Sequence, residues 1–316
     1  MSVPADEVRR LARDCADGRC VVFADGATQT AARRLARAAA ALGTTVADVH
    51  GTSLAAIDQI HAALRRRGAT RRTAVVAYGG GALLDAVRIA AALFEGGAPA
   101  ILVATTLGAA IDRGVDPVAR RGCVHVTAPP TALLVDYAAI PASARDGLGT
   151  LVRDAFIEGD EFFDGMETLA PHPLGKWPWQ SVIDDALRVD RMHAGDDRRI
   201  LELGMPFAAA IAATHPMETQ HALALGLRAA CLAGRRIAAF SERDHLRVLA
   251  VLALLGFALH HARLDPDAVV AAIPNGTRFA LPHAIGDVEA GIVIPRQVLR
   301  RAVQRLTSTP GAAEFR

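Results

Sequence analysis

The feature that most constrains the fold is the stretch from 74 to 106, AVVAYGGGALLDAVRIAAALFEGGAPAILVATT. Its apolar run Ala74–Tyr78 has the length of a strand, three glycines follow, and the next residues place apolar side chains at helical spacing. A Gly-Gly-Ala-Pro segment ends this helix, and Ala100–Val103 predicts a second strand. Such a strand–turn–helix–strand unit belongs to parallel sheets, and glycines at its turn let a phosphate approach backbone N–H groups. A tight turn without a ligand remains the alternative interpretation of the glycines.

The rest of the first half repeats this alternation of strands and helices. Strands are predicted at Cys20–Ala24, Thr45–Val49 and Ala132–Asp136, and helices at Thr28–Leu42 and Leu54–Arg67. The rhythm predicts an α/β, Rossmann-like domain of the nucleotide-binding type over residues 1–140, with a parallel sheet flanked by helices.

The second half changes character after Pro141. Convincing strands become scarce, and helical periodicity runs through Ser143–Ile157, Trp179–His193, Ile200–Ala213, Thr219–Gly234 and Ser241–Leu259. An all-α helical domain is therefore expected over residues 141–316, with any active cleft between the two halves.

Composition argues against several classes of function. The net charge is +2 and the arginines are scattered along helices, which gives no basis for nucleic acid binding. The apolar run Val248–Leu259 is too short to span a membrane, and the charged N-terminus lacks the apolar core of a secretory signal. The four cysteines form no C-x-x-C pair, so neither a disulfide framework nor a zinc knuckle is indicated. A cytoplasmic protein that acts on a small molecule is expected.

Six segments in a fixed order run through both halves. They are GGGALLD (79–85), ATTLGAAID (104–112), PPTALLVD (129–136), ARDGLGTLVRDAFIEGDEFF (144–163), RRILELGMPFAAAI (198–211) and LPHAIGDV (281–288). Together they resemble the 3-dehydroquinate synthase family and, more broadly, the sugar phosphate cyclases, which include the 2-epi-5-epi-valiolone synthases. The resemblance covers about residues 20–300. It implies a dehydroquinate synthase-like fold that holds NAD in the N-terminal domain and a divalent metal in the C-terminal domain, and it implies a homodimer.

The resemblance places the family's metal ligands at positions where this chain has other residues. Thr150 stands at the position of a glutamate in a GLAEVIK-like helix, and Met205 stands at the position of a histidine in an LGH segment. The second histidine falls on Thr219 when Gly226 is matched to the family glycine, and on His221 by ungapped counting. Threonine and methionine are poor ligands for the divalent ions concerned, so the sequence indicates that the metal site is lost.

A rebuilt metal site is the alternative. His215, Glu218 and His221 follow one another at spacings of three residues near the start of a predicted helix. The competing interpretation is an ordinary helix N-terminus, in which His215 caps or packs and the charge of Glu218 favours the helix dipole.

The nucleotide contacts that the resemblance implies are only partly present. The matching residues, which are candidates for cofactor binding, are Asp25, Gly79, Gly80, Gly81, Asp85, Thr105 and Thr106. The family also uses a glutamate and a lysine in a turn after the second strand, where this chain has GTSLA (51–55). NAD binding is therefore expected to be weakened but not lost.

The substrate contacts differ in the same way. Asp112 matches a family aspartate, but the lysine and asparagine motifs that follow it are replaced by DPVARRGC (116–123), which leaves Arg120 and Arg121 as anion contacts. Arg153 stands at the position of a helical lysine. That exchange keeps the charge, but arginine stays protonated and cannot serve as a base near neutral pH.

Two hypotheses follow for the function. In the first, the chain is an enzyme repurposed for a metal-independent cyclisation, elimination or rearrangement in natural-product (secondary-metabolite) biosynthesis, and it is not an active 3-dehydroquinate synthase. Its acid/base and arginine candidates are Asp112, Arg121, Asp146, Arg153, Asp154, His215, Glu218 and His221. In the second, it is a non-catalytic relative that serves as a scaffold, partner subunit or ligand sensor.

Overall fold

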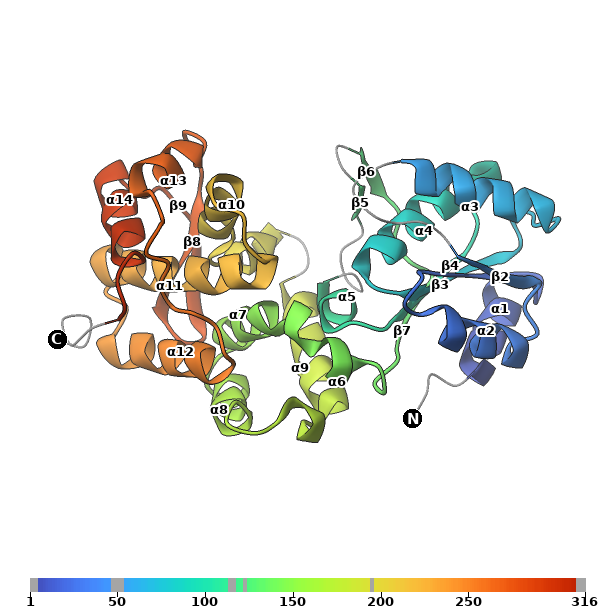
Figure 1. The fold of residues 1–316 in the computed structure, drawn as a ribbon, viewed down its shortest axis with the longest axis horizontal. Helices are drawn as coiled ribbons and strands as arrows, with labels where there is room; N and C mark the ends of the chain where they lie inside the picture. The colour runs from blue at the N-terminus through green and yellow to red at the C-terminus, as the bar shows by residue number, and fades with distance from the viewer. Residues whose placement is uncertain (1–4, 47–53, 113–117, 122–123, 194–195, 311–316) are drawn as a thin grey trace. The chain divides into compact units, whose positions relative to one another are not determined.

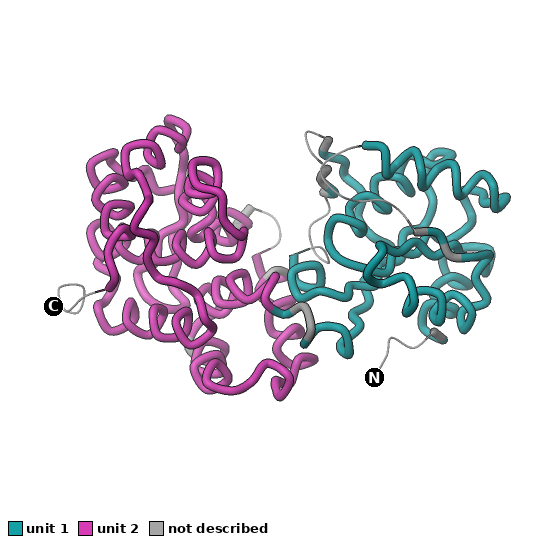
Figure 2. Tube along the Cα trace, viewed as in Figure 1, with its two compact units in different colours: residues 1–144 teal, residues 145–316 magenta. Residues whose placement is uncertain are grey.

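The computed structural model describes residues 5–46, 54–112, 118–121, 124–193 and 196–310, and Figure 1 labels its helices and strands. The chain divides into two compact units, residues 1–144 and 145–316 (Figure 2). The sequence predicts the boundary between residues 140 and 141, four residues before the division between 144 and 145 in the structure.

Unit 1 is built on a five-stranded parallel sheet with the order β2-β1-β3-β4-β7. Its strands are β1 (Cys20–Ala24), β2 (Gly43–Val46), β3 (Ala74–Gly79), β4 (Ala100–Ala104) and β7 (Ala132–Val135). Its helices are α1 (Ala5–Cys15), α2 (Gln29–Ala38), α3 (Ala55–Arg66), α4 (Gly81–Leu93), the short η1 (Phe94–Gly96) and α5 (Leu107–Asp112). The predicted α/β fold is confirmed.

The central strands explain why sequence patterns suffice for this half. Strands β1, β3 and β4 are buried along their whole lengths, because helices cover a parallel sheet on both faces. In the sequence, such strands are continuous apolar runs that end at glycine or at charged residues. A small antiparallel hairpin, β5 (Val118–Arg121) and β6 (Val124–Thr127), was not predicted, since its VARR strand is short and charged. Residues 47–49 of the predicted second strand lie outside the described residues.

Unit 2 is mainly helical, as expected. The short helix α6 (Ile140–Ser143) ends unit 1, and η2 (Ala144–Asp146) spans the boundary. The helices of unit 2 are α7 (Leu148–Glu158), α8 (Asp160–Leu169), η3 (Leu174–Lys176), α9 (Trp179–Met192), η4 (Asp196–Glu202), α10 (Met205–Thr214), α11 (Thr219–Ile237), α12 (Glu242–Leu254), α13 (Pro266–Ala272) and α14 (Arg296–Arg305).

The prediction of an all-α second half needs one correction. Strands β8 (Phe279–Ala284) and β9 (Asp287–Ile292) form an antiparallel hairpin around a turn that contains Gly286 with φ +83°. Pro282 inside the first strand argues against a strand in the sequence. The structure accommodates this proline with an irregular register between Pro282 and Ala284.

Glycines also divide two helices that the sequence predicts as continuous. The predicted helix Ser143–Ile157 is interrupted before α7, where Gly147 precedes the first helical residue. The predicted helix Ile200–Ala213 is divided between η4 and α10 at Gly204, whose φ of +76° is left-handed.

Helices α10 and α11 approach each other closely at two glycines. A Cβ atom added at Gly226 would meet the carbonyl oxygen of Gly204 at 2.3 Å and the backbone nitrogen of Ala208 at 3.0 Å. A Cβ atom at Gly204 would meet the backbone nitrogen of Leu227 at 2.8 Å. The contact is backbone against backbone, so only glycine fits at either position.

Both tryptophans of the chain lie in unit 2 and are buried there. The rings of Trp177 and Trp179 stack with their centroids 5.1 Å apart, and their indole N–H groups donate to the carbonyl oxygens of His172 and Leu174. Tryptophan fluorescence therefore reports on the folding of this unit.

His245 of α12 is fully buried in unit 2. Its Nδ1 lies 3.5 Å from Nη1 of Arg235, and its Nε2 has no hydrogen-bond partner within the described chain. Burial, and to a lesser extent the positive charges of Arg235 and Arg228, lowers the pKa of His245 to about 4. The imidazole is therefore neutral in the folded protein over the whole physiological range.

Acid should destabilise unit 2 through this histidine. An unfolded histidine has a pKa of about 6.5, so between pH 6.5 and 4 the unfolded chain binds a proton that the folded chain does not. The free energy of unfolding is therefore expected to fall as the pH decreases through this range, by about 3 kcal/mol for His245 alone. His245→Asn should flatten that part of the pH dependence, measured by urea unfolding with tryptophan fluorescence. His172→Asn, at an exposed position, should leave the slope unchanged, and an unaltered slope in His245→Asn would contradict the assignment.

Candidate functional site

The carboxyl ends of the central strands bring most of the predicted nucleotide residues together. In the parallel register, Ala24 pairs with Tyr78, and Gly79 pairs with Ala104. Asp25, the three glycines 79–81 and the two threonines 105–106 therefore follow neighbouring strands at one edge of the sheet. This edge is the usual binding position for ligands in open α/β sheets.

Asp25 is held rigidly at this edge. Its Oδ1 accepts from the backbone N–H of Thr28 at 2.9 Å and lies 2.7 Å from Oγ1 of Thr28. A Cβ atom at Gly79 would meet Oδ2 of Asp25 at 2.9 Å and Cδ2 of Leu83 at 2.8 Å. A side chain at 79 would therefore have to displace the ends of the Asp25 and Leu83 side chains.

Gly80 has a different environment. It precedes α4 with φ −84° and ψ 175°, which any residue adopts, and a Cβ atom there would meet nothing closer than Cγ2 of Thr106 at 3.4 Å. Neither backbone conformation nor packing explains a glycine here. Its lack of a side chain leaves the backbone at the start of a 13-residue helix open to a ligand.

The threonines and Asp85 have structural roles at the same edge. The backbone N–H of Thr105 donates to the carbonyl oxygen of Gly79, and Oγ1 of Thr106 accepts from the backbone N–H of Ala109. Asp85 is 3% exposed and lies 3.8 Å from Nη1 of the buried Arg88. Of the predicted nucleotide residues, Asp85 is thus the one whose carboxylate is enclosed in the core.

Sequence patterns missed a buried polar pair at this edge. The hydroxyl of Tyr78 donates to Oδ2 of Asp136, which joins the carboxyl ends of β3 and β7. Burial, together with the hydrogen bond to Asp136, raises the pKa of Tyr78 above its usual value. The only signal was positional: a tyrosine and an aspartate each end a predicted strand.

In unit 2, Thr150 stands at the position of the family's glutamate. It contacts Gln220, a residue that no sequence pattern singled out. The backbone N–H of Thr150 donates to Oε1 of Gln220 at 3.1 Å, and Nε2 of Gln220 lies 3.4 Å from Oγ1 of Thr150. Both side chains are buried. A Cβ atom at Gly149 would meet Oε1 of Gln220 at 2.8 Å, so a small residue beside Thr150 makes room for this contact. A neutral, mutually satisfied pair therefore joins α7 to α11.

The other positions matched to metal ligands are more exposed. Met205 begins α10 with 41% of its surface exposed, and Thr219 is the exposed first residue of α11. Gly226, on which the Thr219 assignment rests, is the glycine that α10 requires for its close approach.

Arg153 and Asp154 form a buried ion pair on α7. Asp154 is fully buried and Arg153 is 7% exposed. Nε and Nη2 of the guanidinium donate to Oδ1 of Asp154 at 2.8 and 2.6 Å. Adjacent residues on a helix do not face each other, so the long arginine side chain folds back to reach the carboxylate. The positive charge expected at 153 is present and held in place.

His215, Glu218 and His221 are not brought together as a site. Nδ1 of His215 lies 2.9 Å from Oγ1 of Thr214, and Nε2 lies 3.0 Å from the carbonyl oxygen of Arg263. Because a carbonyl only accepts, Nε2 of His215 carries a hydrogen and this imidazole ties α10 to a later loop. Glu218 is exposed before α11. Among the described residues, no group of three or more His, Cys, Asp or Glu side chains is arranged to hold a metal ion.

His221 differs from His215 in having both ring nitrogens available. Its ring packs edge-on against Phe257 with the centroids 6.4 Å apart, and it is half-buried. Within the described chain, neither nitrogen has a hydrogen-bond partner. Of the two predicted histidines, this one is therefore the better candidate for contact with a ligand.

For the remaining predicted site residues, Asp112, Asp146 and Arg121, the structure gives the element in which each lies. Asp112 ends α5 and is half-buried, and Asp146 is exposed in η2. The backbone of Arg121 pairs with Val124 in the β5–β6 hairpin, and its side chain lies outside the described residues. In the part of the chain that the structure describes, no helix combines the length and apolarity needed to cross a membrane.

Comparison with known proteins supports the resemblance found in the sequence. Residues 43–140 match the family described as 3-dehydroquinate synthase N-terminal. A 3-dehydroquinate synthase from Solibacter usitatus is 28% identical over 263 residues, which cover 74% of each chain. A 2-epi-5-epi-valiolone synthase from Streptomyces albus is 25% identical over 266 residues, which cover 73% of this chain and 65% of that protein.

Solved structures agree on the fold. The 2-epi-5-epi-valiolone synthase ValA from Streptomyces hygroscopicus, with NAD+ and Zn2+ bound, superposes with a TM-score of 0.80 at 20% identity over 91% of this chain and 90% of its own. A 2-deoxy-scyllo-inosose synthase superposes with a TM-score of 0.81 at 18% identity, covering 95% and 94%. The chain therefore has the fold of these cyclases, and its sequence is similar to that of the dehydroquinate synthases.

Proposed function

We propose that this chain, a divergent relative of the 3-dehydroquinate synthases and sugar phosphate cyclases, is an enzyme repurposed for metal-independent chemistry on a small anionic molecule. The reaction class is a cyclisation, elimination or rearrangement driven by proton transfer, and we assign it to natural-product biosynthesis. The observation that supports this most strongly is that Thr150, at the family's glutamate position, is neutral and bonds through its backbone N–H and its hydroxyl to the neutral side chain of Gln220.

The residues present do not fit a divalent metal. A zinc or cobalt site needs three nitrogen, sulfur or carboxylate ligands, whereas the matched positions hold a buried threonine, an exposed methionine and either Thr219 or His221. His215 has both ring nitrogens engaged in bonds within the protein. The proposed reaction therefore uses no metal ion.

A dinucleotide fits the sheet edge of unit 1 better. Gly80 leaves the start of α4 uncovered, so a diphosphate would bind at the backbone of residues 80–81, and Asp25 is placed to accept from a ribose hydroxyl. When bound, the nicotinamide supplies hydride transfer. The protein residues only bind and orient it.

His221 is the group that we assign to proton transfer. A general base or acid must reach the substrate proton, and His221 is half-buried with both nitrogens unbonded within the described chain. Arg153, whose guanidinium is oriented by its ion pair with Asp154, would position an anionic substrate through hydrogen bonds rather than through net charge. We also propose that the chain forms a homodimer and is located in the cytoplasm.

A second candidate function is a non-catalytic ligand sensor or partner subunit. Two observations favour it: His215 serves to join α10 to a loop, and the charge of Arg153 is largely satisfied by Asp154. His221 is the residue whose substitution separates the two functions.

The test is consumption of a metabolite by the purified chain. Wild-type protein, incubated with NAD and a cell extract in the presence of EDTA, should convert at least one anionic metabolite detected by mass spectrometry. His221→Asn should slow that conversion by about 10²- to 10⁴-fold, as expected for loss of a general acid or base. His172→Asn, at an exposed position, serves as the control and should retain the activity.

Two outcomes would decide against the enzyme. Activity that disappears with EDTA and returns with Zn²⁺ would contradict the metal-independent mechanism. A metabolite that binds without conversion, equally well to wild type and His221→Asn, would support the sensor instead.

A further inference from the structure

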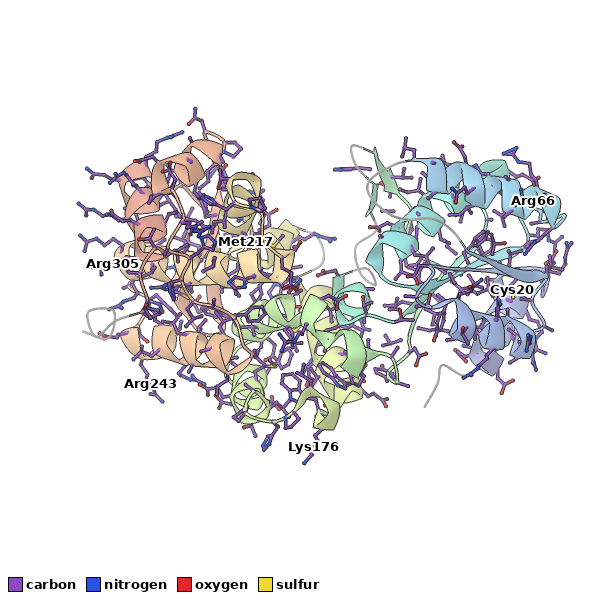
Figure 3. All side chains as sticks on the ribbon, viewed as in Figure 1. Cys20, Arg66, Lys176, Met217, Arg243 and Arg305 are labelled. Atoms are coloured by element: carbon purple, nitrogen blue, oxygen red, sulfur yellow. The ribbon has the colours of Figure 1, made fainter. Side chains whose placement is uncertain are left out.

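A second candidate site lies in unit 2 and includes none of Thr150, Arg153 and His221. A pocket of about 690 Å³ lies between α11 and α14. Three arginines line it: Arg236 from the last turn of α11, and Arg301 and Arg305 from α14. Arg305 is labelled on α14 in Figure 3. The same helix α11 carries Gln220 near its other end, about 24 Å along the axis from Arg236 at 1.5 Å per residue.

The three arginines differ from neighbouring arginines of α14, which have partners within the described chain. Arg300 makes a two-pronged ion pair with Asp267, at 2.7 and 3.2 Å, and Arg296 donates to Asn275 at 2.7 Å. By contrast, the pocket-lining arginines have no hydrogen bond or ion pair from their guanidinium groups within the described chain.

Among the described residues that line the pocket, none carries a carboxylate. Besides the arginines, the lining consists of apolar side chains, Gln304, Thr307 and Ser308. The carboxyl ends of α11 and α14 contribute about −0.5 charge each, which three guanidinium charges outweigh. The like charges repel one another in an empty pocket, and a bound anion converts that repulsion into attraction.

We propose that this pocket binds a small anion with two or more negative charges, of the phosphorylated or polycarboxylate metabolite class. Its volume suits a small molecule, since ligand pockets commonly measure about 300–1,000 Å³. Guanidinium groups bind phosphate and carboxylate oxygens in pairs, so Arg301 and Arg305, one helical turn apart, present two such forks on one face. Arg236 adds a third from the facing helix.

The experiment is a titration of the full chain with inorganic pyrophosphate, in which isothermal titration calorimetry measures the binding. Saturable binding of pyrophosphate is expected. The double variant Arg301→Gln/Arg305→Gln should lower the affinity at least tenfold. Arg300→Gln, on the same helix but paired with Asp267, should change it less than twofold. Because the contacts are exposed, the affinity should also fall as salt is raised. A parallel titration with citrate distinguishes a phosphate ligand from a carboxylate ligand.

Three results would overturn the proposal. These are the absence of saturable binding of either anion, equal affinity in the wild type and the double variant, and an equal loss in Arg300→Gln. A short DNA duplex that binds more tightly than pyrophosphate, through the same residues, would also overturn it in favour of a nucleic acid surface. Substitutions at these exposed positions should leave the fold intact, which tryptophan fluorescence checks.

Discussion

Gly226→Ala is expected to lower the free energy of unfolding of unit 2 by about 3 kcal/mol or more. An added Cβ atom would lie 2.3 Å from the carbonyl oxygen of Gly204 and 3.0 Å from the backbone nitrogen of Ala208. Neither atom belongs to a flexible side chain, so α10 and α11 must separate. The higher helix propensity of alanine, worth about 1 kcal/mol, offsets only part of this cost.

Urea unfolding followed by tryptophan fluorescence measures this effect. Gly165→Ala is the matched control, because Gly165 is also helical, within α8, and an added Cβ atom there would meet nothing within 4 Å. It should stabilise the protein slightly, by up to about 1 kcal/mol. Equal effects of the two substitutions would show that α10 and α11 do not approach as described.

Asp154→Asn is expected to destabilise unit 2 by about 3–5 kcal/mol. The substitution removes the negative charge that faces the guanidinium of Arg153, with Asp154 fully buried and Arg153 7% exposed. Removing one member of a buried ion pair is costly, whereas replacing both members with apolar residues removes the charge altogether. Arg153→Met/Asp154→Leu should therefore lose less stability than the sum of the two single substitutions.

Urea unfolding again provides the measurement. The control is Asp267→Asn, which breaks an ion pair with Arg300 on the surface, where both side chains are more than half exposed. Solvent and salt screen that pair, so the change should be far smaller. If Asp154→Asn were as mild as Asp267→Asn, Arg153 would have ready access to water or to another carboxylate.

The fold of the first half could be predicted because its signals are local. Strands such as Cys20–Ala24 are buried on both faces, so the apolar run alone marks them, and the glycines at 79–81 mark the turn to the next helix. The β8–β9 hairpin could not be predicted in this way. Pro282 argues against a strand, and only packing against the helices of unit 2 stabilises the irregular pairing around it.

The candidate site was only partly predictable. Sequence comparison placed Thr150 at a family ligand position, but its partner Gln220 lies 70 residues away and belongs to no recognised pattern. Spacing likewise suggested that His215, Glu218 and His221 form a cluster. Instead, His215 bonds to the carbonyl oxygen of Arg263, a contact that depends on how α10 ends.

The sequence by itself determined the order of elements in the α/β half, the helical character of the second half and the residues at each matched position. Those properties depend on periodicity, turn chemistry and alignment, which are local. Only the tertiary structure decided which side chains meet. It joined Thr150 to Gln220, distinguished His221 from the engaged His215, and gathered around one pocket three arginines whose guanidinium groups have no partner among the described residues. Contacts between residues distant in the chain depend on how helices pack, and no local pattern contains that information.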